Sequence, residues 1–231
     1  VTAADHAAEE YLIDAIQTAF PGHTINAEES GYLAGTAEHH WYLDPLDGTL
    51  NYAHGVPFYS VSVAYAFRGQ MTLGVVYDPT RDECFVGARG QGAWLNEQPI
   101  GVGQKEALID CMLVTGFAQN KWGAEEDNIG DFVRFSMHTQ TVRRLGSAAL
   151  EAAYVAAGRL DGFWSDGVND WDIAAGALII QEAGGVVTDK FGRADFLTEP
   201  ISIVGANPTI HTLMLEKLAE ERKHKTVFYH P

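Results

Sequence analysis

The stretch from residue 59 to residue 96 limits the possible folds most strongly. In its first segment, Tyr59 to Phe67, large residues alternate with small ones at the period of a β-strand. Three further apolar segments follow at short intervals, separated by turn-forming residues such as Asp78-Pro79. We therefore predict an antiparallel meander, with strands at 59–67, 71–77, 83–88 and 93–96.

The rest of the chain has different patterns of apolar residues. Before the meander, apolar residues from Ala8 to Phe20 follow the i, i+3, i+4 spacing of an amphipathic helix. After about residue 105, strand and helix patterns alternate: strands at 111–115, 141–145, 160–164, 186–188 and 201–205, and helices at 127–135, 147–157, 171–183 and 209–222. We predict an α+β protein whose first half, 1–104, carries an antiparallel sheet with helices, and whose second half, 105–231, adds an α/β layer.

Composition limits the possible partners. Acidic residues number 31 against 15 basic ones, a formal charge of −16, which disfavours nucleic acid as a partner. No apolar run is long enough for a membrane span and no signal peptide is recognisable, so we expect a cytoplasmic protein without membrane contact. The two cysteines, Cys84 and Cys111, lie in apolar segments and are expected to be buried thiols.

The segment with the most chemical information is Asp44-Pro45-Leu46-Asp47-Gly48-Thr49, which follows the strand-like Trp41 to Leu43 and is expected to form a loop at that strand's end. Pro45 stiffens the connection between the two aspartates, and two adjacent like charges are relieved by a hard cation such as Mg²⁺. Gly48 permits a close backbone approach to a phosphate. The alternative interpretation is a surface turn with an aspartate cap, since each of these residue types favours turns.

Two further acidic segments add to this interpretation. Glu28-Glu29-Ser30 lies upstream, and Asp170-Trp171-Asp172 begins a predicted helix. Asp172 alone could equally be a first-turn residue that favours the helix dipole. His39 and His40 are interpreted as exposed histidines of a polar loop rather than metal ligands.

Taken in order, these motifs resemble those of the inositol monophosphatase family of Mg²⁺-dependent, lithium-sensitive phosphatases. The resemblance covers nearly the whole chain, and the matching segments are Glu28 to Ser30, Trp41 to Tyr52, Gly74 to Pro79, Gly90 to Ala93, Trp171 to Gly176 and Glu182 to Gly185. It implies a layered αβαβα sugar-phosphatase-like fold, a homodimer, and hydrolysis of a small phosphorylated alcohol to the alcohol and inorganic phosphate.

The resemblance also implies roles for the residues that match. Two or three Mg²⁺ ions would be bound by the side chains of Glu28, Asp44, Asp47 and Asp172 and by the carbonyl of Leu46. Asp5 would act with Thr49 in activating the attacking water, while Glu28 and Asp47 also serve catalysis. The residues expected at the phosphate and substrate are Asp47, Gly48, Thr49, Gly146, Ser147, Ala148, Ser165, Asp166 and Asp172.

One position departs from the family pattern. Many inositol phosphatases of the family have a glutamate seven residues before the last aspartate ligand, where this chain has Ser165. Either the adjacent Asp166 contacts the inositol hydroxyls instead, or the alcohol is not inositol. Inositol 1-phosphate is the first candidate, and histidinol phosphate, fructose 1,6-bisphosphate and nucleotide 3′-phosphates are the alternatives within the family. An alternative of another class is a regulatory module that binds proteins through the same fold.

Overall fold

The computed structural model describes residues 1–116 and 128–222, with side chains to residue 220. In the described part of the chain, an eight-stranded sheet has the order β2-β1-β3-β4-β5-β6-β7-β8 and a five-stranded sheet has the order β10-β9-β11-β13-β12. The strands are β1 (His23–Ala27), β2 (Gly31–Leu33), β3 (Thr36–Asp47), β4 (Ser60–Phe67), β5 (Gln70–Asp78), β6 (Glu83–Ala88), β7 (Gly92–Leu95), β8 (Gln98–Pro99), β9 (Met112–Thr115), β10 (Thr141–Arg143), β11 (Gly162–Asp166), β12 (Val186–Thr188) and β13 (Ser202–Ala206).

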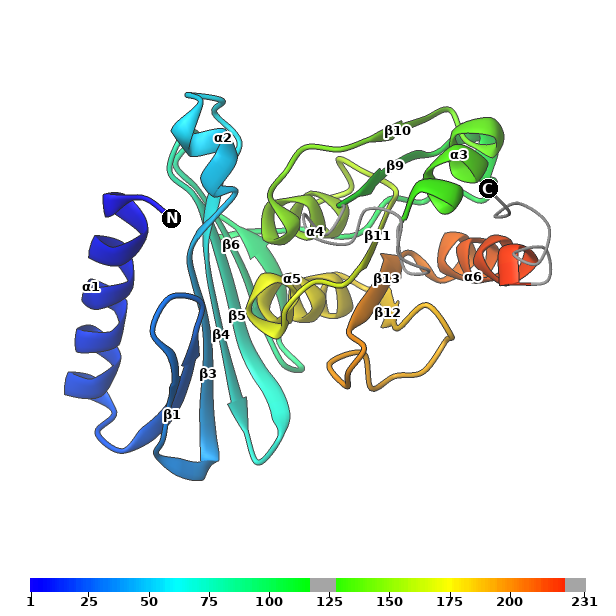
Figure 1. Ribbon diagram of the computed structural model, residues 1–231. Coiled ribbons are helices and arrows are strands. Elements are labelled where there is room, and N and C mark those ends of the chain that lie inside the picture. Colours follow the sequence, from blue (N-terminus) through cyan, green and yellow to red (C-terminus); the bar gives the residue numbers. More distant parts are fainter. Residues whose placement is uncertain (117–127, 223–231) are drawn as a thin grey trace, which may run out of the picture.

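Helices separate and cover the two sheets. The helices are α1 (Ala3–Ala19), α2 (Thr49–Ala53), α3 (Ile129–His138), α4 (Ala148–Ala156), α5 (Asp170–Glu182) and α6 (Pro208–Arg222), with a 3₁₀ turn at Leu108–Asp110. Figure 1 shows α1 on the outer face of the larger sheet, α4 and α5 between the sheets, and α3 and α6 beyond the smaller sheet. The predicted α+β class and its αβαβα layering are confirmed.

The central helix α5 is buried because its sequence is apolar on every side. It packs against β4, β5 and β6 of the larger sheet and against β12 and β13 of the smaller one, and α4 lies beside it in the same layer. Gly74 in β5 allows this close packing, since a Cβ there would lie 2.6 Å from the carbonyl oxygen of Ala175. The position of α5 matters for the site because the acidic start of this helix lies against the larger sheet, where Asn26 of β1 donates to Asp170 at 2.9 Å.

The meander is confirmed, and β4 through β7 pair antiparallel with their neighbours as the sequence predicts. The sequence prediction missed β1, β2 and β8. The first of these pairs parallel with β3, so the larger sheet is not purely antiparallel. The helix predicted at 127–135 begins at Ile129 as described, and residue 127 lies outside the described residues.

The prediction that His39 and His40 are exposed residues of a polar loop was wrong. His39 and His40 belong to β3, which begins at Thr36 and pairs with β4 as far as Phe67. The ring of His39 stacks on that of His23 at 4.0 Å between centroids, and the ring of His40 stacks on Tyr42 at 4.5 Å. Strand pairing therefore overrides the polar character of the local sequence.

Candidate active site

The two aspartates of the central motif lie within β3 and not in a loop after it, which corrects the sequence prediction. Side chains three positions apart on a regular strand point to opposite faces. Here the pairing with β4 shifts, because Asp44 lies opposite Ser62 and Asp47 opposite Ser60. Three steps along β3 thus match two along β4, and this one-residue bulge turns both carboxylates to the same side. Pro45 suits the bulge because it has no N–H to donate to the neighbouring strand.

Asp47 is held by the beginning of α4, a hundred residues later in the sequence. Its carboxylate accepts hydrogen bonds from Ser147 Oγ at 2.6 Å, from the Ala148 amide at 3.1 Å and from the Ala149 amide at 2.7 Å. Burial raises the pKa of Asp47 to about 6, although these hydrogen bonds lower it. The segment predicted to line the substrate pocket therefore also fixes a predicted metal ligand.

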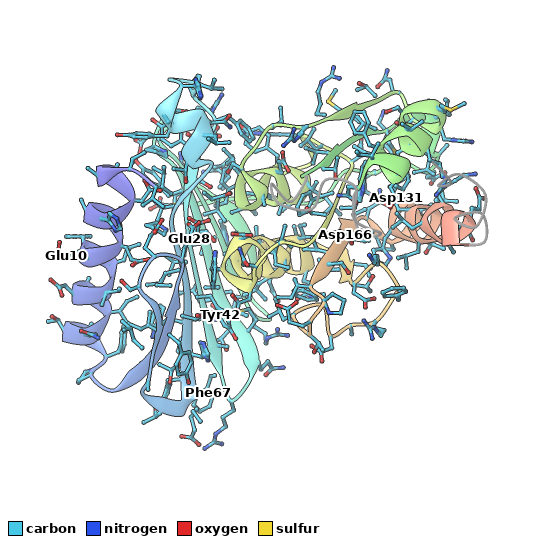
Figure 2. All side chains as sticks on the ribbon, viewed as in Figure 1. Glu10, Glu28, Tyr42, Phe67, Asp131 and Asp166 are labelled. Atoms are coloured by element: carbon cyan, nitrogen blue, oxygen red, sulfur yellow. The ribbon has the colours of Figure 1, made fainter. Side chains whose placement is uncertain are left out.

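Glu28 reaches the aspartates through the parallel pairing of β1 with β3. Ala27 lies opposite Leu43, and the amide of Glu28 donates to the Leu43 carbonyl at 3.1 Å. The next residue on each strand is an acid, so Glu28 comes to lie beside Asp44. Figure 2 shows Glu28 between α1 and α5.

Asp172 completes the cluster from the first turn of α5. Its Oδ2 accepts a hydrogen bond from the Asn169 amide at 2.7 Å, so Asp172 does occupy the first-turn position considered as the alternative, as part of a capping box with Asn169. Burial raises the pKa of Asp172 to about 8, and the charge of Asp47 adds to this. The cap and the proposed ligand role use the same carboxylate without conflict, since each oxygen has two lone pairs.

These acids share one cavity of about 680 Å³. It is lined by Glu28, Asp44, Leu46, Asp47, Gly48, Thr49, Leu50, Asn51, Gly116, Arg144, Leu145, Gly146, Ser147, Ala148, Glu151, Ser165, Gly167, Val168, Asn169 and Asp172. Among these described residues Arg144 carries the single basic side chain, so the wall is strongly acidic. Burial and the charges of Asp47 and Glu28 raise the pKa of Asp44 well above its usual value.

This donor set suits a hard cation such as Mg²⁺. The Oε2 atom of Glu28 is buried without a hydrogen-bond partner among the described residues, and burial raises the pKa of this carboxyl. Carboxylate and carbonyl oxygens are the ligands that Mg²⁺ prefers. As the side chains stand, however, no three His, Cys, Asp or Glu side chains of the described segments are arranged to hold a metal ion. The acids are gathered in one cavity, and cation binding would require their carboxyl groups to turn toward a common point.

Thr49 lies at the start of α2, next to the cluster. Its hydroxyl lies 3.1 Å from Asp5 Oδ1 and 3.1 Å from the Leu46 carbonyl oxygen, and its single proton serves one acceptor at a time. Hydrogen bonds from Thr2 hold the pKa of Asp5 below its usual value, despite burial. Gly48 adopts a φ of 98°, and a Cβ there would lie 3.1 Å from the Gly146 carbonyl oxygen. Only glycine fits this turn without strain.

The far wall of the cavity contains the position where the family pattern is broken. Ser165 is buried there, and its hydroxyl lies 3.5 Å from the Gly116 carbonyl oxygen. Asp166 does not line the cavity, and its Oδ2 accepts from Lys190 Nζ at 3.1 Å. Alternation along β11 directs the two side chains to opposite faces. The structure thus gives no support to a substrate contact by Asp166.

The sequence analysis did not identify four residues around the site. Glu151 and Arg144 line the cavity, Asn51 ties α2 to the Leu145 carbonyl at 2.7 Å, and Glu9 binds the turn that follows Glu28. The sequence did contain a pattern that could have identified the two glutamates. Glu151 is a single acid in an apolar helical segment, and Glu9 stands one helical turn after Asp5, on the same face of α1.

The sequence model of the inositol monophosphatase family matches residues 1–224 of this chain. A protein named Nus factor SuhB from Pseudomonas aeruginosa is 41% identical over 219 residues, which cover 93% of this chain and 81% of that protein. An inositol-1-monophosphatase from Mesorhizobium japonicum is 41% identical over 217 residues, covering 94% and 81%. The structure of an inositol monophosphatase from Anabaena superposes with a TM-score of 0.92 at 42% identity, covering 95% of this chain and 87% of that one. The chain therefore belongs to the inositol monophosphatase family.

Proposed function

We propose that this chain is a Mg²⁺-dependent phosphomonoesterase that hydrolyses a small phosphorylated alcohol, with inositol 1-phosphate as the first candidate substrate. One observation carries the proposal: four carboxyl groups from three distant segments face one cavity, and the pKa of each is raised. Such a cluster is costly unless cations neutralise it. Bound Mg²⁺ would lower the pKa of a water and stabilise negative charge on the phosphoryl group and leaving oxygen.

The residues of the chain would divide the remaining work. Glu28, Asp44, Asp47, Asp172 and the Leu46 carbonyl would hold the cations. The Asp5–Thr49 pair would orient the attacking water and accept its proton, since the Thr49 hydroxyl can pass its own proton to Asp5 over 3.1 Å. Gly48 and the segment Gly146 to Ala148 would hold the phosphate against the acidic wall.

The substitution Asp44→Asn tests the proposal with little effect on folding. An asparagine oxygen can still accept the Leu46 amide, which lies 3.0 Å from Asp44 Oδ1, and its NH₂ group can donate to Glu28 as a protonated Asp44 would. We expect turnover to fall by more than the roughly 10–100-fold typical of outer-shell losses, with a melting temperature in EDTA that is not lowered, because the raised pKa of Asp44 costs stability that asparagine does not. Asp14→Asn, which changes an exposed acid of α1, is the matched control. Turnover within a few-fold of wild type in Asp44→Asn would refute the mechanism.

The identity of the alcohol is a separate question, because Ser165 offers a hydroxyl where a carboxylate would bind inositol. A panel of inositol 1-phosphate, histidinol phosphate, fructose 1,6-bisphosphate and a nucleotide 3′-phosphate would rank these candidates by kcat/KM. Preference for a substrate other than inositol 1-phosphate would keep the reaction class and change the substrate.

A second candidate function comes from the relatives named Nus factor SuhB. We propose protein binding as a role beside catalysis, independent of the cation site. A partner that co-purifies equally with the wild-type chain and with Asp44→Asn would support this role. Loss of the partner in Asp44→Asn would tie it to the cation site instead.

A further inference from the structure

Helix α1 carries two buried acids, one helical turn apart. Asp5 and Glu9 are 0% and 2% exposed, whereas the neighbouring Glu10 is exposed. Figure 2 shows Glu10 on the side of α1 that faces away from the sheet. The proposed chemistry uses Asp5 through Thr49 but gives Glu9 no part, and a buried carboxylate requires polar partners.

The partners of Glu9 are the two residues that directly follow Glu28. Glu9 Oε2 accepts a hydrogen bond from the Glu29 amide at 2.9 Å. Its Oε1 accepts one from the Ser30 amide at 2.8 Å and one from Ser30 Oγ at 2.5 Å. Both carboxylate oxygens are therefore engaged by one short turn, and a charged acceptor makes such hydrogen bonds strong.

This turn determines where Glu28 lies. Before it, the Glu28 amide is fixed to the Leu43 carbonyl at 3.1 Å. The Glu28 side chain has a buried Oε2 without a hydrogen-bond partner among the described residues, and it lies among other acids that repel it. A hydrogen bond between the Glu28 and Asp44 carboxyl groups leaves Oε2 unpartnered, so side-chain contacts do not fully fix the position of Glu28. The backbone must do so, from β3 on one side and from Glu9 on the other.

Helix α1 is firmly anchored for this task. Ile16 packs with Ile25, Trp41 and Leu43 in a buried cluster on the outer face of the larger sheet. The helix is therefore a rigid support, from which Asp5 reaches α2 and Glu9 reaches the turn after β1.

We propose that Glu9 is a positioning residue, which clamps the turn 28–30 so that the Glu28 carboxylate points at Asp44 and completes the cation site. This inference rests on the proposed function of the acidic cluster. Partners of this outer kind orient ligands and keep them ready for the metal.

The substitution Glu9→Gln tests the clamp, with Glu10→Gln as the matched control on the same helix. Glutamine has one acceptor oxygen, so its NH₂ group must face either the Glu29 amide or the Ser30 donors. We expect the Mg²⁺ dissociation constant, measured by calorimetry, to rise on the order of 10-fold in Glu9→Gln and to stay unchanged in Glu10→Gln. At saturating Mg²⁺, kcat should stay within about twofold of wild type, because the proposed defect is in cation binding.

Hydrogen exchange without cation gives an independent measurement. The amides of Glu29 and Ser30 should exchange slowly in the wild-type protein and faster in Glu9→Gln. Should Glu9→Gln fail to fold, the comparison of wild type with Ser30→Ala decides. Slow exchange at these amides that Ser30→Ala accelerates supports the clamp, and rapid exchange in the folded wild type overturns it.

The outcomes separate the clamp from the proposed function. A wild-type protein that binds no Mg²⁺ would overturn the proposed function and the clamp's purpose with it. A wild type that binds Mg²⁺ with the same constant as Glu9→Gln would overturn the clamp alone. A lower kcat with unchanged Mg²⁺ dependence would also overturn it, since that is the result of general damage.

Discussion

Glu151 provides a quantitative test of the electrostatics around the cavity. This residue of α4 is 1% exposed, and its Oε1 accepts hydrogen bonds from the Leu145 amide at 2.7 Å and the Gly146 amide at 3.0 Å. Both bonds use one oxygen, so a glutamine in the same rotamer keeps them. The substitution Glu151→Gln therefore removes the titration of this group with little change to the packing.

The magnitude follows from the pKa. Burial raises the pKa of Glu151 from 4.5 to about 8; the two amide hydrogen bonds and Arg144 lower it, and the charge of Asp47 raises it. Between these values the unfolded chain has released the proton while the folded chain keeps it, so stability falls as pH rises. At about 1.4 kcal/mol per pH unit, the wild type should lose about 3 to 4 kcal/mol of unfolding free energy through Glu151 from pH 5 to pH 8.

The assay is urea unfolding of both proteins in EDTA at pH 5, 6.5 and 8. The acids of the cation site titrate in both proteins and largely cancel in the difference between them. The free energy of unfolding of Glu151→Gln should be similar to that of the wild type at pH 5 and higher than it at pH 8. A difference between the proteins that stays constant over this range would show that Glu151 titrates normally, and that the cavity wall is more hydrated than its burial indicates.

One further substitution and the addition of Mg²⁺ also test the site. Gly48→Ala places a Cβ 3.1 Å from the Gly146 carbonyl oxygen at a φ of 98°. We therefore expect the free energy of unfolding in urea to fall by about 1 to 3 kcal/mol, and turnover to fall as well because this turn lines the cavity. An unfolding free energy and a turnover equal to those of the wild type would mean that the turn can relax. Mg²⁺ at about 100 times its dissociation constant should stabilise the wild type by about 2.7 kcal/mol and leave Asp44→Asn unchanged in a thermal melt, and equal shifts in both would place the cation elsewhere.

Local patterns predict most elements of this fold. The alternation from Tyr59 to Phe67 corresponds to β4, and the helical spacing before Phe20 corresponds to α1. Within the described residues no helix combines the length and apolar character that crossing a membrane demands. Periodicity identifies β4 and α1 because each of these two elements buries one face along its own length. It fails for β1, whose five residues are too few to show a clear period.

The site is less accessible to sequence reasoning, because its geometry comes from pairing between distant strands. The motif shows two aspartates three residues apart, but only the shift against Ser60 and Ser62 explains why both face one cavity. Pro45 was the local sign of that irregularity. The hydrogen-bond partners of Glu9 likewise cannot be recognised in the sequence, because Ser30 lies 21 residues away from it.

The two halves of the chain cannot be assigned separate chemistry. The first sheet supplies Asp47, yet the donors that hold its carboxylate come from the start of α4. Asp172 reaches the same cavity from α5, which packs between the sheets. Without this packing, Asp47 would lose its hydrogen bonds, and the acids of β3 would lose one member of their cluster. A cation at this site would therefore link both halves, so that its binding energy stabilises the packing between the sheets as well as the end of β3.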